Sequence, residues 1–119
     1  MKIAVPAQGR DLSSEIDPRY GHAEWLIVVD TETGKFNVQK NRVDQSASIF
    51  GLQTVQNTFE LDVEAVIVNN IGPNAFTVLN TSGIKIFLCQ SGTIKQALAL
   101  LEAGKLKEVD HATVKGHSF

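Results

Sequence analysis

Short apolar runs alternate with helical patterns along the second half of this chain, and this alternation constrains the fold more than any other feature. Residues 65–68 form a continuous apolar run that suits a central buried strand, and residues 84–89 are a second candidate. Each run is followed by a segment with helical periodicity, so parallel strands must be joined by right-handed crossovers. The sequence therefore predicts an α/β fold built on a buried sheet.

The first half of the chain predicts three further strands. Residues 2–6 are apolar and end at a proline, residues 25–30 are apolar almost throughout, and residues 35–40 alternate as in a half-exposed edge strand. A turn at 31–34, ending in glycine, joins the last two strands as an antiparallel hairpin. We expect a mixed five-stranded sheet of order 3-2-1-4-5, with strand 2 antiparallel and helices on both faces. This is the three-layer architecture of the ribonuclease H-like fold.

Three helices are expected between and after these strands. Residues 48–60 carry one apolar stripe. The residues of that stripe are Ile49, Leu52, Val55 and Phe59. A shorter helix opens near Pro73 and ends just before Gly83. The third begins at a capping box, in which Thr93 is the N-cap and Gln96 follows three residues later.

Length and charge limit the class of protein. The 119 residues suffice for one domain over 1–106, and residues 107–119 are expected to be a flexible C-terminal tail. The 11 basic and 13 acidic residues give a formal charge of −2. A balance so close to neutral gives no sign of binding to nucleic acid or to an anionic membrane. No apolar stretch approaches the roughly 18–20 residues of a membrane span, and the start lacks a signal-peptide pattern. We therefore expect a cytoplasmic protein.

Catalytic patterns are missing from the sequence. A two-metal nuclease on this fold needs converging carboxylates, one of them usually on the central first strand, and residues 2–6 contain no acid. The chain has no phosphate-binding loop, dinucleotide-binding turn or nucleophile elbow. The single cysteine, Cys89, has no histidine beside it in sequence, so a buried core thiol is expected. We expect that the protein is not an enzyme.

The long loop after the first strand holds the most informative segment, residues 17–23. It combines the permanent cation of Arg19, an aromatic ring, a glycine and the imidazole of His22 just before a strand. Arginine supplies several hydrogen-bond donors, and histidine can donate, titrate or bind a metal. The alternative is a packed loop that Tyr20 anchors and in which Arg19 pairs with a neighbouring carboxylate.

A second segment, residues 69–74, lies where a predicted parallel strand leads into a helix. Unpaired N–H groups at helix N-termini favour anions, although a tight turn and cap would explain the same residues. Ligands in open α/β sheets bind outside the carboxyl ends of strands. Both segments should therefore meet at one sheet edge and form one binding site. The candidate residues are Arg19, Tyr20, Gly21, His22, Asn70, Gly72, Pro73 and Asn74.

Four stretches of the sequence, 2–6, 17–23, 72–76 and 83–85, resemble the dinitrogenase iron–molybdenum cofactor biosynthesis family of NifX, NifB and NafY type. The resemblance extends over about residues 1–106. It implies the ribonuclease H-like sheet and a role in binding, carrying or inserting iron–molybdenum or related metal–sulfur clusters. Small stand-alone members include a protein that holds a molybdenum–copper sulfide cluster.

The resemblance also implies roles for individual residues. Nitrogenase-associated members have a histidine where this chain has Arg19 and a phenylalanine where it has Tyr20, while His22 matches a second histidine of some members. This favours noncovalent holding of an anionic cluster. Arg19 and the 72–74 amides would supply positive potential, Tyr20 an apolar wall, and His22 a donor or single metal ligand.

The expected function is that of a binding or carrier protein for an anionic metal–sulfur cluster, with a cluster-donating or cluster-receiving protein as partner. A metal-free protein–protein interaction or regulatory module on the same fold is the alternative. His111 and His117 are expected to be solvated tail histidines.

Overall fold

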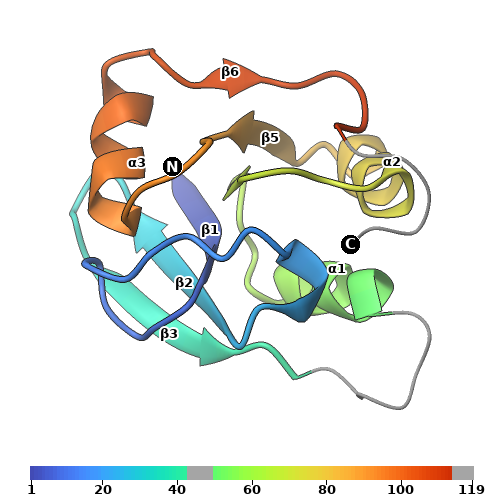
Figure 1. The fold of residues 1–119 in the computed structure, drawn as a ribbon, viewed down its shortest axis with the longest axis horizontal. Coiled ribbons are helices and arrows are strands. Elements are labelled where there is room, and N and C mark those ends of the chain that lie inside the picture. Colours follow the sequence, from blue (N-terminus) through green and yellow to red (C-terminus); the bar gives the residue numbers. More distant parts are fainter. Residues whose placement is uncertain (43–49, 114–119) are drawn as a thin grey trace.

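The computed structural model describes residues 1–42 and 50–113 of the chain. Its helices and strands follow the alternating order that the sequence predicts, with one short 3₁₀ helix (η1) in the long loop (Figure 1). The elements are β1 (Lys2–Ala7), η1 (Tyr20–His22), β2 (Trp25–Asp30), β3 (Phe36–Lys40), α1 (Phe50–Glu60), β4 (Ala65–Val68), α2 (Pro73–Thr81), β5 (Lys85–Leu88), α3 (Ile94–Glu102) and β6 (Lys107–Glu108).

The strands form one mixed sheet of order β3-β2-β1-β4-β5-β6. β1, β4 and β5 are parallel, whereas β2 is antiparallel to both of its neighbours. The predicted order 3-2-1-4-5 and the antiparallel second strand are confirmed. The mixed α/β architecture is confirmed as well, and the assignment to the ribonuclease H-like fold stays a prediction.

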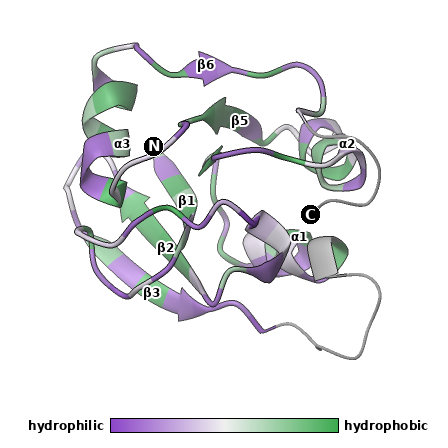
Figure 2. Cartoon of the chain, viewed as in Figure 1, coloured by the Kyte–Doolittle hydropathy of each residue, from purple (hydrophilic) through white to green (hydrophobic). Residues whose placement is uncertain are grey.

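The predicted count of five strands is wrong, because a sixth strand comes from the segment expected to be the tail. Lys107 and Glu108 pair antiparallel with β5. Both side chains are charged and exposed, so the hydropathy pattern gave no sign of a strand (Figure 2). β6 pairs with β5 through backbone groups, which every residue has.

Each face of the sheet carries its own core, because successive residues of a strand point to opposite faces. Ile3 and Ile67 belong to the core under α3, together with Ile94 and Ala97 of that helix. The opposite face, with Val66, packs against α1 and α2. The helices accordingly lie on both sides of the sheet (Figure 1).

The ends of α2 and α3 are formed by the residues that the sequence predicts. Pro73 is in the first turn of α2, and Gly83 follows its end with φ +80°, a conformation that favours glycine. Thr93 and Gln96 make both bonds of the capping box, at 3.1 and 2.9 Å. No helix within residues 1–42 and 50–113 is long and apolar enough to cross a membrane.

The inner face of α1 differs from the predicted apolar stripe. Leu52 is 38% exposed, whereas Val55 is buried and Phe59 is half-buried. Thr54 and Thr58, which the predicted stripe does not include, are fully buried on the same helix. Ile49 and the predicted helix start at residue 48 lie outside the described residues.

Candidate functional site

The two predicted segments meet at one edge of the sheet. β1 and β4 are parallel neighbours, so the loops that follow them leave the sheet on the same side. The Nδ2 atom of Asn70, just after β4, donates a hydrogen bond to the carbonyl oxygen of Pro18 at 3.1 Å. The long loop and the β4–α2 loop are therefore in direct contact.

The long loop is fixed to the sheet at several points before it reaches Arg19. The Asp17 amide donates to the Pro6 carbonyl of β1 at 2.9 Å. The Ile16 amide donates to the Gly92 carbonyl at 3.1 Å, beyond β5. The segment that carries Arg19 consequently starts from a defined position on the sheet edge.

Arg19 extends into solvent beside a largely buried carboxylate. Its side chain is 69% exposed, and its Nε atom lies 3.9 Å from Asp17 Oδ1. The same oxygen accepts a 2.9 Å hydrogen bond from the Arg19 backbone N–H. An ion pair at this distance and exposure contributes at most about 1 kcal/mol. Arg19 therefore keeps most of its donors for another partner, although it pairs with Asp17 as the alternative interpretation expects.

Tyr20 anchors the loop from inside the core. Its side chain is 2% exposed, and its hydroxyl lies 2.6 Å from Thr58 Oγ1 of α1. Burial raises the pKa of Tyr20 far more than the Thr58 hydrogen bond lowers it. The ring was predicted to be an apolar wall of the site. It lies in the core instead, where it fixes the position of its chain neighbours Arg19 and Gly21.

A buried polar network continues the attachment of the loop to α1. Thr54 Oγ1 donates to the Gly21 carbonyl at 3.2 Å, and Asn41 Nδ2 lies within hydrogen-bond distance of both Ala23 O (2.8 Å) and Thr54 Oγ1 (3.0 Å). The His22 amide donates to the Arg19 carbonyl within η1, at 3.0 Å. This network was not predicted from the sequence. The i, i+4 spacing of two threonines on the inner face of a helix was the available signal.

The start of α2 forms the other side of the site. The N-cap residue, Gly72, has no side chain to cap the helix, and the first helical bond runs from Phe76 N to Gly72 O at 3.0 Å. Within residues 1–42 and 50–113 the amide N–H of Asn74 has no acceptor, and Asn74 is exposed. Among the described residues, the start of α2 therefore offers an unpaired N–H of an exposed residue at the positive end of the helix dipole.

The eight predicted residues thus divide into two groups. Arg19 and Asn74 are exposed, and His22, Asn70 and Pro73 are half-buried. The three that are buried are Tyr20, Gly21 and Gly72. The first group can contact a ligand directly, whereas the second group shapes the backbone.

The other candidate metal ligands are Cys89, His111 and His117. In the described part of the chain no three His, Cys, Asp or Glu side chains come together as a metal site. Cys89 is buried in the core under α3, and its Sγ donates to the Ser91 carbonyl at 3.3 Å, so the prediction of a core thiol is confirmed. His111 is exposed and lies 2.7 Å from Asp110, while His117 is outside the described residues.

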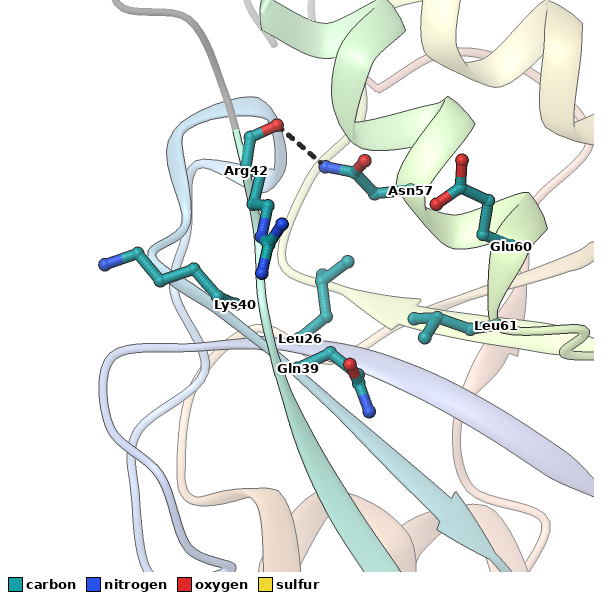
Figure 3. A pocket seen from close by; sticks show the side chains of 7 residues that line it. All are labelled: Leu26, Gln39, Lys40, Arg42, Asn57, Glu60 and Leu61. Carbon is teal, nitrogen blue, oxygen red and sulfur yellow. Dashed lines mark hydrogen bonds between the residues drawn. The ribbon is translucent and has the colours of Figure 1, made fainter.

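A pocket of about 380 Å³ lies elsewhere, between the β2–β3 edge and α1 (Figure 3). Its lining residues are Leu26, Gln39, Lys40, Arg42, Asn57, Glu60 and Leu61. None of the eight predicted residues lines it. The predicted site is therefore distinct from this pocket.

Proteins of known structure share this fold over nearly their whole length. The apo form of the orange protein from Desulfovibrio gigas is 28% identical, with a TM-score of 0.89 over 95% of this chain and 96% of that chain. A Thermotoga protein, described as a proposed NifB protein of the DUF35 family, is 33% identical, with a TM-score of 0.80 over 97% and 98%. An uncharacterized protein of Methanocaldococcus jannaschii, MJ0580, is 29% identical over 92% of both chains.

A family model points to the same group of proteins. The model described as "Dinitrogenase iron-molybdenum cofactor" matches residues 1–104, which include β1 to α3 and both segments of the predicted site. The match covers most of the chain, and the resemblance seen in the sequence is confirmed. The chain belongs to the dinitrogenase iron–molybdenum cofactor family.

Proposed function

We propose that this protein binds an anionic metal–sulfur cluster, of iron–molybdenum or molybdenum–copper type, and carries it during cluster assembly or delivery without altering it. The cluster is cargo, held where the long loop meets the start of α2. The observation that carries the proposal is the Asn70–Pro18 hydrogen bond, which places Arg19 and the α2 N-terminus on the same edge. A cluster-donating or cluster-receiving protein would be its partner.

The donor set at this edge suits a sulfide-rich anion. Arg19 offers an exposed guanidinium, whose planar array of N–H groups binds anions by charge and hydrogen bonds. The start of α2 adds the exposed Asn74 amide and the helix dipole. His22 would add a hydrogen-bond donor or a single direct metal ligand, because the described residues bring no three metal-binding side chains together as a ligand set.

Family membership and the neighbours support this assignment. The family is named for the iron–molybdenum cofactor, and the D. gigas orange protein has been described in an apo form, which implies a bound group in its complete form. The Thermotoga protein is described in terms of NifB. Both match nearly the whole chain, so the site edge is part of the shared structure.

A titration tests the proposal. Tetrathiomolybdate, with and without copper(I), is added anaerobically to the purified chain, and the visible charge-transfer absorption is recorded. We expect a saturable new band with the wild type and its loss in the Arg19→Ala/His22→Ala double variant. The control is the Lys35→Ala/Asn37→Ala double variant, in which both residues are exposed at the β3 edge of the sheet. This variant should bind as the wild type does.

Two results would overturn the proposal. One is a band that persists unchanged in the Arg19/His22 variant, which would place the cluster elsewhere. The other is the absence of any saturable band, together with a protein that co-purifies with the metal-free chain. That second result would favour the interaction or regulatory module.

A further inference from the structure

The C-terminal segment 109–113 is attached to the core at both of its ends. At one end Val109 is buried among the residues under α1 and α2, and its amide donates to the Ile86 carbonyl of β5 at 2.9 Å. At the other end Thr113 is bound to Ile71 in the β4–α2 loop. The segment thus crosses from β5 to the loop that precedes α2.

Thr113 binds Ile71 through three hydrogen bonds. Its hydroxyl accepts from the Ile71 N–H at 2.8 Å and lies 3.3 Å from the Ile71 carbonyl. Its own backbone N–H donates to the same carbonyl at 2.9 Å. Both backbone groups of Ile71 are therefore held by one residue that is 42 positions away in sequence.

Ile71 occupies a central position in the proposed site. Asn70, on one side, holds the Pro18 carbonyl of the long loop, and Gly72, on the other side, begins α2 without a side-chain cap. Because a trans peptide is planar, a fixed Ile71 carbonyl also fixes the direction of the Gly72 N–H. Thr113 consequently sets the peptide plane that leads into the first turn of α2.

We propose that Thr113 is a positioning residue of the cluster site, which it holds ready for an anion by orienting the start of α2. This inference rests on the proposed function. The family match ends at residue 104, so the site would be completed by a segment outside the matched region. Thr113 acts through Ile71 and Gly72 and does not need to contact the cluster.

Three variants of the full chain test this role. Thr113→Val keeps the shape and the backbone bond but removes the hydroxyl, and Thr113→Ser restores the hydroxyl. Thr31→Val is the matched control at the opposite edge of the sheet, where the Thr31 hydroxyl lies 3.1 Å from both the amine and the carbonyl oxygen of Met1. The readouts are the tetrathiomolybdate dissociation constant and amide hydrogen exchange at Ile71, which donates to the Thr113 hydroxyl, and at Phe76, which makes the first hydrogen bond of α2.

We expect Thr113→Val to weaken binding about tenfold, the order of one lost hydrogen bond, and to speed exchange at both amides. Thr113→Ser should bind within about twofold of the wild type, and Thr31→Val should match the wild type in both readouts. A merely structural role would speed amide exchange at Ile71 in Thr113→Val and leave the tetrathiomolybdate dissociation constant unchanged.

The outcomes separate this inference from the proposed function. If the wild type binds and Thr113→Val binds equally well, the positioning role is wrong and the function stands. If the wild type does not bind tetrathiomolybdate, the function fails, and amide exchange alone decides whether Thr113 orients α2. Unchanged exchange at Phe76 in Thr113→Val would then overturn the inference too.

Discussion

The side-chain amide of Asn70 donates a hydrogen bond to the carbonyl oxygen of Pro18, across 52 positions of sequence. Asn70 is the second residue after β4, and Pro18 directly precedes Arg19. This one contact joins the loop with the exposed cation to the loop that starts α2. In the proposed site it brings together two segments that would each bind an anion only weakly, since one charge–dipole contact contributes only about 0.3–1 kcal/mol.

Removing this contact should loosen the site more than the fold. Asn70→Ala loses the bond to Pro18 and should lower the free energy of unfolding by about 0.5–1 kcal/mol, since the bond is solvent-exposed. Urea denaturation measures this loss. Amide exchange at Arg19 to His22 should increase, because the loop loses one of its attachments. Asn80→Ala, at an exposed position of α2, should change neither, and equal effects in the two variants would contradict the role of Asn70.

The charge of Asp17 should weaken anion binding at this edge. Its carboxylate lies 3.9 Å from Arg19 Nε, so Asp17→Asn removes a negative charge and keeps an oxygen that can accept the Arg19 N–H. We expect tetrathiomolybdate to bind several-fold, up to about tenfold, more tightly, with a gain that shrinks as salt is added. Glu32→Gln makes the same charge change at an exposed position of the far edge and should leave affinity unchanged. Weaker binding in Asp17→Asn would contradict the electrostatic account.

Most of the fold could be predicted because its signals are local. Glycine in the β2–β3 turn has φ +75°, as the hairpin requires, and the Thr93 capping box forms as written in the sequence. The strand order followed from alternation and crossover handedness. β6 could not be predicted in this way, because two charged residues pair with β5 through backbone groups that every residue has.

The buried phenol of Tyr20 should make stability fall in alkaline solution. Its pKa is raised in the folded chain by burial, whereas the unfolded chain ionises near the usual value of about 10. The unfolded state therefore loses its proton first as the pH rises, and the stabilisation that is complete below pH 10 is lost above it. The loss is about 1.4 kcal/mol per pH unit.

Tyr20→Phe isolates this effect. The variant should be less stable by about 1 kcal/mol at neutral pH, through loss of the bond to Thr58, and should lack the tyrosine part of the alkaline decline. Tyr20 is the only tyrosine of the chain, so the ultraviolet absorption of its phenolate reports on it alone. Ionisation of Tyr20 near pH 10 in the folded protein would contradict the buried position.

The candidate site was predictable in outline and not in detail. Parallel β1 and β4 were enough to bring the two segments to one edge. The inward position of Tyr20 was not predictable, because a single aromatic residue in an irregular loop has no periodicity and its partner Thr58 is 38 positions away. The contact between Thr113 and Ile71 was not predictable for the same reason, since it depends on a segment with no helical or strand pattern.

The metal and sulfide content of the protein isolated anaerobically from its native source tests the central claim most directly. We predict molybdenum or iron together with acid-labile sulfide on the wild-type chain, and neither on the Arg19→Ala/His22→Ala variant isolated in the same way. Equal metal and sulfide on both chains, or none on the wild type, would contradict the account.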